Sequence, residues 1–284
     1  MNKTILFTAS FVMFIFSACK KDKVDVDLET QTSQDNSLAE GIFNDINNIA
    51  NQASSNGSLS TYRLTQEGQE GSLLSTCATV TVRPDSSGTG GNVDVDFGST
   101  PCRCSDGRFR KGMLTVYYTG AYRDSGTQIV STLNNYYVGL DSLNLYKVEG
   151  SKTVVNRGHN GNGYLYFTID VNNARITNPS GTTMSWTSSR QREWVAGENT
   201  TTIWIDDEYK ITGSASGTNF SGTGFTVSIT SPLVFSLGCP YIKQGTFELT
   251  PANKPTRTFD YGEGTCDPYA TVTLSGRTFN IVLR

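Results

Sequence analysis

The stretch LYFTIDV, residues 165–171, decides the fold class, because apolar and other side chains alternate along it. Successive side chains of an extended chain point to opposite faces, so the odd-numbered residues of this stretch form a continuous apolar face. The same period of two occurs on both sides of it along the chain, in residues 93–97, 225–229 and 279–283. One apolar and one polar face per strand is typical of antiparallel sheets with one face in water.

Turn signals containing glycine separate these stretches: Ser87-Gly88, Asp106-Gly107, Ser125-Gly126, Asn160-Gly161, Ser180-Gly181 and Ser275-Gly276. We therefore expect about a dozen strands, joined mostly by short hairpins. Strands do not alternate with helices, which argues against a parallel sheet. The sequence predicts an all-β antiparallel meander, either a two-sheet sandwich or an open, barrel-like sheet, and periodicity does not decide between the two.

One helix is expected before the strands. Ser37 and Glu40 have the spacing of a capping box, and apolar residues then recur every three or four positions at Leu38, Ile42, Ile46, Ile49 and Ala53. This pattern predicts an amphipathic helix over residues 37–54. We expect its apolar stripe to lie against the sheet and cover one open end or edge. A peripheral helix that binds a partner is the alternative.

The N-terminus resembles the signal sequence and lipobox of a bacterial lipoprotein. A positive start is followed by the apolar run Ile5–Phe16, and then by Ser17-Ala18-Cys19. The resemblance implies that residues 1–18 are a signal peptide and that Cys19 carries lipid, which is a stable membrane anchor when two or more acyl chains are attached. An ordinary signal peptide cleaved near Ala18 is the alternative. Residues 19–36 are polar and aperiodic, and they are predicted to be a flexible tether.

The composition of the mature chain limits its partners. Removal of residues 1–18 leaves 284 − 18 = 266 residues, and loss of Lys3 changes the formal net charge from −3 to −4. This charge balance predicts no nucleic-acid partner. The membrane is the expected partner, reached through the N-terminal lipid.

Two pairs of segments indicate an internal duplication. YKVEG at 146–150 and YKITG at 209–213 are each followed, ten residues after the tyrosine, by an asparagine and then by a pair of glycines. Asp96-Phe97-Gly98 and Asp260-Tyr261-Gly262 each begin six residues before a cysteine. The chain is therefore interpreted as a β domain over residues 77–284 with two pseudo-repeats, about 77–175 and 183–284. Chance similarity between hairpins is the alternative.

The cysteines follow the same pairing. Five remain after Cys19, namely Cys77, Cys102, Cys104, Cys239 and Cys266. Equivalent positions should form equivalent bonds in an exported protein, which predicts Cys77–Cys102 and Cys239–Cys266 and leaves Cys104 over. Each bridge would close a loop of about 26–28 residues and contribute about 3 kcal/mol. Cys77–Cys104 is the competing pair.

No group of residues has the pattern of an active site. The only histidine, His159, lies in a glycine-rich turn, and Cys102-Arg103-Cys104 lacks the spacing of a metal site. Asp94 and Asp96, and likewise Asp206-Asp207-Glu208, read as solvated charges on strands rather than as calcium ligands or catalytic carboxylates. We therefore expect neither metal nor cofactor, and we do not expect an enzyme.

One strand offers a candidate ligand face. In an extended chain Trp186, Arg190, Arg192 and Trp194 share a side, and such a stripe can stack on sugar rings and hydrogen-bond their hydroxyl groups. These residues indicate a possible glycan or protein ligand. The alternative is burial of both tryptophans, with the arginine stems packed over them.

Several short motifs resemble those of a set of uncharacterised lipoproteins of Bacteroidetes. They are Cys77-Ala78-Thr79-Val80-Thr81-Val82, Val95-Asp96-Phe97-Gly98, Asp106-Gly107-Arg108, Arg110-Lys111-Gly112, Tyr118-Thr119-Gly120, Asn135-Tyr136-Tyr137-Val138, Arg192-Glu193-Trp194, Pro232-Leu233-Val234 and Asp260-Tyr261-Gly262. The resemblance implies lipidation at Cys19 and an outer-membrane location, with the body facing the periplasm or the cell surface. It implies no activity.

The predicted function is that of a lipid-anchored cell-envelope lipoprotein, a non-enzymatic binding or structural module. The alternative is a carbohydrate-binding or carbohydrate-active surface protein, which would use the tryptophan and arginine face together with acidic residues.

Overall fold

The described part of the chain is a single antiparallel sheet wrapped around one helix. The computed structural model describes residues 29–58, 78–86, 88–104, 106–200 and 205–283, with residues 51–58 described as backbone only. The elements are α1 (Gln31–Ser58), β1 (Thr79–Pro84), β2 (Gly91–Asp96), β3 (Cys102–Arg103), β4 (Phe109–Tyr118), β5 (Gln128–Gly139), β6 (Tyr146–His159), β7 (Leu165–Thr177), β8 (Thr183–Ala196), β9 (Glu208–Thr218), β10 (Gly224–Ser236), β11 (Ile242–Pro251), β12 (Arg257–Glu263), β13 (Tyr269–Leu274) and β14 (Arg277–Val282).

The sheet is a meander in which the strands pair in chain order. Only the two-residue β3 leaves this path, because it pairs with β4 alone. The sheet does not close, so β1 and β14 form its outer edges. The prediction of an all-β antiparallel meander is confirmed, and of the two expected forms the open sheet is the correct one. The apolar residues of LYFTIDV are buried, as the alternation predicts.

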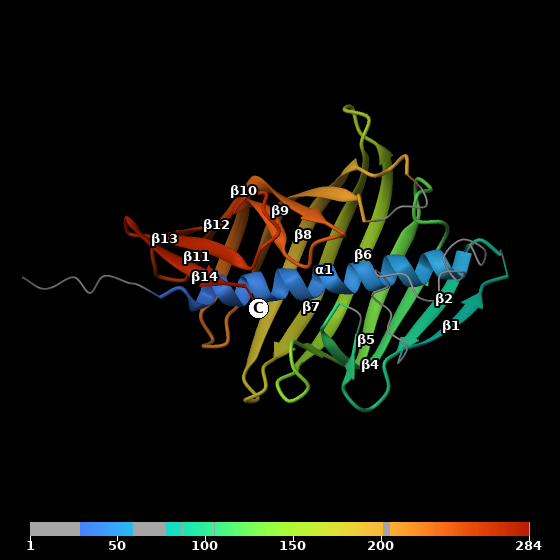
Figure 1. Ribbon diagram of the computed structural model, residues 1–284, viewed down its shortest axis with the longest axis horizontal. Helices are drawn as coiled ribbons and strands as arrows, with labels where there is room; N and C mark the ends of the chain where they lie inside the picture. Colours follow the sequence, from blue (N-terminus) through green and yellow to red (C-terminus); the bar gives the residue numbers. More distant parts are fainter. Residues whose placement is uncertain (1–28, 59–77, 87, 105, 201–204, 284) are drawn as a thin grey trace, which may run out of the picture.

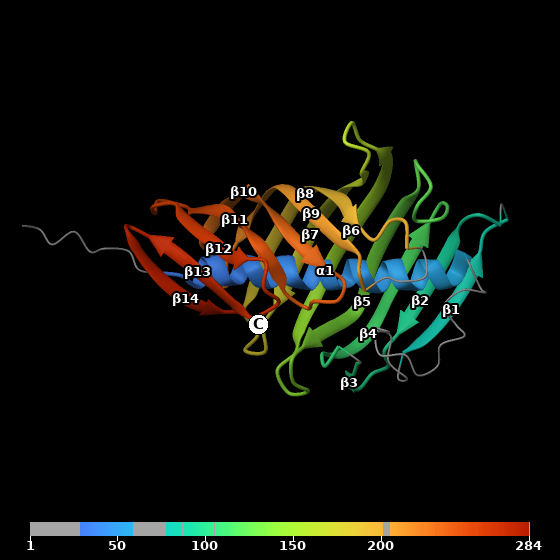
Figure 2. The ribbon, with the colours of Figure 1, turned by 45° about the horizontal axis from the view of Figure 1, so that its top comes forward.

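The helix lies along the concave face of the sheet. In Figure 1 it crosses in front of β4 to β8, whereas in Figure 2 strands from β9 onward pass in front of it, so the sheet curls around it. It contacts β1, β2, β4, β5 and β11. The expectation that the helix covers an end or edge of the sheet is therefore wrong, because α1 forms the centre of the core.

The helix also begins earlier than predicted. It starts at Gln31, and the backbone carbonyl of Thr30 accepts hydrogen bonds from the amides of Ser33 and Gln34 at 3.1 and 3.2 Å. Ser37 lies in the second turn, and its hydroxyl group pairs with the hydroxyl of Tyr261 at 3.0 Å instead of capping the helix. Residues 31–36, predicted to be part of the tether, are helical.

Most of the described side chains of α1 are buried or partly buried, including several polar ones. Ile42, Ile46 and Ile49 of the predicted apolar stripe are buried, while the side chain of Ala53 lies outside the described residues. The buried polar residues of the helix are Thr32, Ser33, Asp35, Asn36, Glu40, Asp45 and Asn47. A simple two-faced helix was the wrong expectation, because the curved sheet supplies polar partners on several sides.

These partners follow the helix in reverse chain order. Near its start, the hydroxyl of Thr32 accepts a hydrogen bond from Asn219 at 2.8 Å, and Ser37 meets Tyr261. Further along, the carboxylate of Asp45 accepts hydrogen bonds from the guanidinium of Arg110 at 2.7 and 3.2 Å. The N-terminal half of α1 thus contacts residues late in the sequence, and its C-terminal half contacts residues early in the sheet.

Glycines allow the sheet to bend where strands come close. Gly112 and Gly213 have φ angles of +84° and +120°, and a Cβ atom would lie 1.9 and 2.2 Å from a backbone oxygen of the neighbouring strand. Such positions introduce local kinks and register shifts that curve a sheet. A register shift does occur between Lys111 and Met113, on either side of Gly112.

The proposed repeats share local structure. The amide of Gly98 donates to the carboxylate of Asp96, and the amide of Gly262 donates to that of Asp260, both at 2.8 Å. A second shared feature is less specific, because three hairpins have the same turn: the side-chain oxygen of Asn160, Asn178 or Asn219 accepts the amide four residues later. The boundary between the halves falls in the β7–β8 turn, and the sheet continues across it. The division into two repeats remains a prediction.

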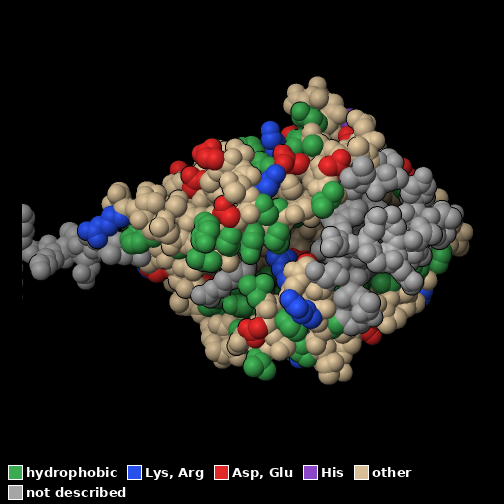
Figure 3. Space-filling view, viewed as in Figure 1, with side chains coloured by type: hydrophobic (Ala, Val, Ile, Leu, Met, Phe, Trp, Pro, Cys, Tyr) green, Lys and Arg blue, Asp and Glu red, His purple; other side chains and the backbone are tan. Residues whose placement is uncertain are grey.

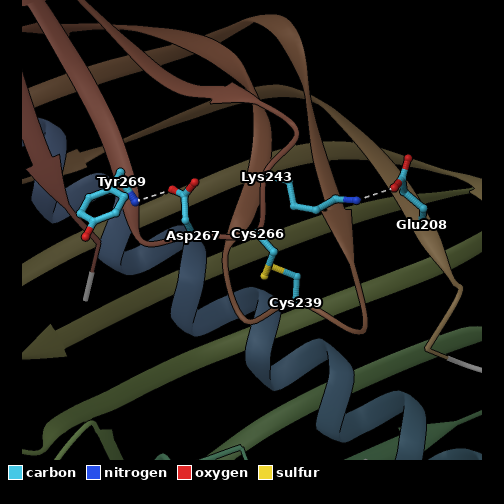
Figure 4. Close-up of a disulfide and its surroundings, with 6 residues drawn as sticks. All are labelled: Glu208, Cys239, Lys243, Cys266, Asp267 and Tyr269. Atoms are coloured by element: carbon cyan, nitrogen blue, oxygen red, sulfur yellow. Dashed lines mark hydrogen bonds and ion pairs between the residues drawn. A yellow bond between two sulfur atoms is a disulfide. The ribbon is translucent and has the colours of Figure 1, made fainter.

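The disulfide Cys239–Cys266 is present, as predicted, and its position above α1 is visible in Figure 4. Cys102 is disulfide-bonded, but Cys77, its predicted partner, lies outside the described residues. Cys104 is buried and carries a free thiol.

Asp45 is the most heavily paired carboxylate of the helix. Besides Arg110, it forms an ion pair with Arg108 at 3.0 Å, and Arg110 in turn pairs with Asp106 at 2.6 Å. Burial raises the pKa of the Asp45 carboxyl, but the charges of and hydrogen bonds from Arg110 and Arg108 outweigh it and hold the pKa below its ordinary value.

We expect Asp45→Asn to lower the free energy of unfolding at pH 7 by about 3–5 kcal/mol, because it leaves buried guanidinium groups without their anion. The folded-state pKa is lowered, so the ionised carboxylate stabilises the fold above the unfolded-chain pKa of about 3.9, and this contribution is lost as the pH falls below it. Urea unfolding at pH 7 and pH 3 measures both effects. Lys147→Gln, which breaks the solvent-exposed pair with Glu149, should change the free energy of unfolding far less, because exposed ion pairs contribute little. Equal losses for both variants would contradict the assignment.

Candidate functional site

The predicted ligand face does not lie on the surface. Trp186, Arg190, Arg192 and Trp194 do share one side of β8, but all four are buried in the interior between the sheet and α1. Their assignment as an exposed face for a glycan or protein is wrong. The alternative of buried tryptophans with arginines packed beside them is the correct one.

Two of these side chains, Trp186 and Arg190, hold the helix in the sheet. The ring of Trp186 stacks on Phe43 with 5.4 Å between centroids, and its indole nitrogen donates to the side chain of Asn36 at 3.0 Å. Arg190 donates to the carboxylate of Glu40 at 2.6 Å. A buried cation next to a buried carboxylate is stable only as a hydrogen-bonded pair, so this contact fixes the position of α1.

A second cationic group lies among aromatic rings. The guanidinium of Arg192 is 4.5 Å from the ring centroid of Tyr209 and 5.3 Å from that of Phe167, and it donates a hydrogen bond to the hydroxyl of Tyr122. Nearby, Lys152 donates to the backbone carbonyl of Phe43 at 2.6 Å. Burial, together with the charges of Arg192 and Arg190, lowers the pKa of Lys152 well below its ordinary value.

The other candidate groups make structural contacts. Asp94 accepts a hydrogen bond from Thr115 at 2.8 Å and pairs with Arg83, while Glu208 pairs with Lys243 at 2.7 Å. His159 contacts Glu198 at 2.7 Å. Within the described ranges, no group of three or more His, Cys, Asp and Glu side chains is arranged to hold a metal ion. The described helix also lacks a stretch with the length and hydrophobicity needed to cross a membrane.

The described structure does hold a groove along one flank of α1, made of two adjoining cavities. The larger has a volume of about 350 Å³ and is lined by Leu38, Gly41, Ile42, Asp45, Arg108, Val138, Gly139, Leu140, Asp141, Asn144, Tyr146 and Pro179. The smaller, of about 270 Å³, is lined by Gln31, Gln34, Asp35, Ser37, Leu38, Tyr146, Asn178, Phe220, Ile281, Val282 and Leu283. Leu38 and Tyr146 line both, so the two cavities lie next to each other, and together they are called the α1 groove.

Apolar and polar side chains both line the α1 groove. Leu38, Ile42 and Tyr146 belong to its apolar lining, while the polar lining includes carboxylates, amides and one guanidinium. The guanidinium is that of Arg108, whose side chain stays 18% exposed while it pairs with Asp45. Figure 3, seen from the same side as Figure 1, shows hydrophobic side chains beside charged ones on the lower part of the molecule.

Gly41 keeps part of the groove open. It lies inside α1, where glycine costs about 0.5–1 kcal/mol relative to alanine. A Cβ atom built at Gly41 meets no atom within 4 Å, so tight packing does not require glycine there. Gly41 is therefore unfavourable for the helix and is not required by packing. Its missing side chain leaves free volume in the wall of the groove.

Sequence reasoning missed this site for physical reasons. Its walls come from α1, β5, the β5–β6 turn and the C-terminal strand, whose proximity follows from the curvature of the sheet rather than from any local pattern. Two signals pointed towards it: the glycine inside the helical pattern, and the leucines of the turn Leu140–Leu145, which interrupt an otherwise polar loop.

Comparison with known proteins does not assign this site. No model of a protein family, no curated protein and no solved structure matches the chain.

We expect Gly41→Ala to raise the free energy of unfolding by about 0.5–1 kcal/mol, because alanine favours the helix and the new methyl group meets open space. Urea unfolding followed by circular dichroism measures the change. A loss of stability would show that the space beside Gly41 is filled, and would remove it from the groove.

Proposed function

We propose that the chain is a lipid-anchored binding protein of the cell envelope and that its ligand occupies the α1 groove. The observation that carries this proposal is the groove itself, with apolar and polar side chains in its lining and a helix glycine in its wall. The lipobox-like sequence ending at Cys19 supports the anchor. Lys20 and Lys21 support an outer-membrane location, because aspartate after the lipidated cysteine often signals retention in the inner membrane.

The dimensions of the groove suit a small or elongated ligand. The larger cavity falls in the range of roughly 300–1,000 Å³ that is usual for ligand sites, and such sites combine apolar walls with a few polar groups. The adjoining smaller cavity extends the site past Leu38 and Tyr146. An amphipathic molecule, with an apolar part and a polar group, fits this mixed lining best.

The carbohydrate alternative has lost its main support. It rested on Trp186, Arg190, Arg192 and Trp194, which are buried and unavailable for stacking on sugar rings. The described acidic residues named as candidates are engaged in strand and turn contacts. A binding role for the α1 groove requires none of these groups.

The anchor is tested by metabolic labelling with palmitate. We expect label in the wild-type protein expressed in a bacterium that processes lipoproteins, and none in Cys19→Ala, because acyl chains are attached through this cysteine. Wild-type protein that carries no label would contradict the anchor and leave the groove as a separate question.

The groove is tested with anilinonaphthalene sulfonate, an amphipathic probe that fluoresces in apolar sites. We expect Gly41→Phe to weaken binding about tenfold or more, because the ring fills volume that the probe needs; this corresponds to about 1.4 kcal/mol. Gly41→Ala should bind as the wild type does.

Gly161→Phe is the matched control, because a Cβ atom at this exposed turn glycine also meets no atom within 4 Å. Equal binding by Gly41→Phe and Gly161→Phe, in folded proteins, would contradict the groove as the binding site.

A further inference from the structure

The β5–β6 turn, residues 140–145, presents two leucines to solvent at the mouth of the α1 groove. Leu143 is 88% exposed and Leu140 is 59% exposed. Among the exposed large hydrophobic side chains of the described residues, that of Leu143 has the greatest exposed fraction. Exposed apolar side chains clustered beside a groove mark interaction sites more often than isolated ones do.

The turn holds these leucines outward in a fixed conformation. One carboxylate oxygen of Asp141 accepts hydrogen bonds from the amides of Leu143 and Asn144 at 2.9 and 2.8 Å, and the side-chain amide of Asn144 adds contacts at 3.1 and 3.2 Å. Hydrogen bonds from the Asn144 side chain and from these amides lower the pKa of Asp141. A preorganised turn loses little conformational entropy when it binds.

The turn is continuous with the groove. Leu140, Asp141 and Asn144 line the larger cavity, whose inner wall includes Leu38 and Ile42. An apolar chain that enters beside Leu140 therefore passes directly from one apolar surface to the next. Such a surface can insert its leucine side chains into the acyl region of a lipid bilayer and can also receive an acyl chain from it.

Charges at the mouth complement a zwitterionic phospholipid headgroup. Arg108 lines the same cavity with a partly exposed guanidinium that pairs with Asp45, and the exposed carboxylate of Asp141 lines it as well. A guanidinium is suited to phosphate and a carboxylate to an ammonium group, so groups of both signs suit a zwitterionic headgroup better than a free fatty acid, which carries only a negative charge.

The chain before α1 sets the distance to the bilayer. Gln31 lines the smaller cavity, so α1 begins on the flank that carries the groove. Nine residues lie between a lipidated Cys19 and Glu29 (29 − 19 − 1 = 9), and the ten steps from one to the other span at most about 35 Å. A tether of this length keeps the start of α1, and with it this flank, near the membrane surface.

We propose that the β5–β6 turn docks on a phospholipid bilayer through Leu140 and Leu143 and that the α1 groove takes up an acyl chain of a zwitterionic phospholipid from it. This inference rests on the proposed function of the groove and specifies its ligand. Each buried methylene group of an acyl chain adds to the binding free energy, so burial of part of one chain suffices for measurable affinity.

The experiment uses the mature chain with Cys19→Ser, so that no anchor of its own holds it to membranes. Vesicles of phosphatidylcholine and phosphatidylethanolamine carry a phospholipid with a fluorescent acyl chain at a self-quenching concentration. Co-sedimentation reports docking, and the rise in fluorescence on extraction of the lipid reports uptake.

We expect Leu143→Asn to reduce co-sedimentation about tenfold, since it removes one inserted leucine side chain. Tyr269→Asn is the matched control, because Tyr269 is 64% exposed on β13 and lines neither cavity of the groove. Gly41→Phe should co-sediment normally but fail to extract lipid.

Two results would overturn the inference: unchanged docking and extraction by Leu143→Asn, or extraction by Gly41→Phe at the wild-type rate. Neither result alters the binding of anilinonaphthalene sulfonate by the wild type or its loss in Gly41→Phe. Failure of the lipid inference is thus distinguishable from failure of the groove as a binding site.

Discussion

The structure depends on enclosing a polar helix inside a curved sheet. Each charged group that α1 brings into the interior requires a hydrogen-bonding or oppositely charged partner, since an unpaired charge in a low-dielectric interior is strongly unfavourable. Glu40 meets Arg190 and Asp45 meets Arg110, with most contacts between 2.6 and 3.2 Å. These pairs determine the rotation and position of the helix, and thereby which flank of α1 stays uncovered and forms the groove.

The same constraint explains how far the sequence alone could go. The alternation of LYFTIDV and similar stretches predicted the strands, because burial on one face of a sheet is a local property. The pairing of Cys239 with Cys266 followed from equivalent spacing, which is also visible along the chain. Curvature is not local: it depends on glycine positions such as Gly112, whose meaning appears only when the neighbouring strand is in place.

The errors share one cause. Ser37 and Glu40 have the spacing of a capping box, but their side chains reach across the interior to Tyr261 and Arg190. The tryptophans of β8 were predicted to be exposed because alternation identifies the two faces of a strand but does not show which face is covered. Taken alone, a polar residue of α1 or an arginine of β8 would be expected to lie in solvent. Each can be buried because the other is its hydrogen-bonding or charged partner.

The reversed order of contacts along α1 has a consequence for biogenesis. The helix leaves the ribosome before every strand, yet the partners of its first turns, such as Asn219 and Tyr261, are among the last residues to be synthesised. A chain made from its N-terminus therefore cannot bury the start of α1 until almost all of it has been synthesised. Completion of the core is coupled to completion of the chain, and a polypeptide interrupted before β12 leaves polar groups of its helix without the partners that the finished protein provides.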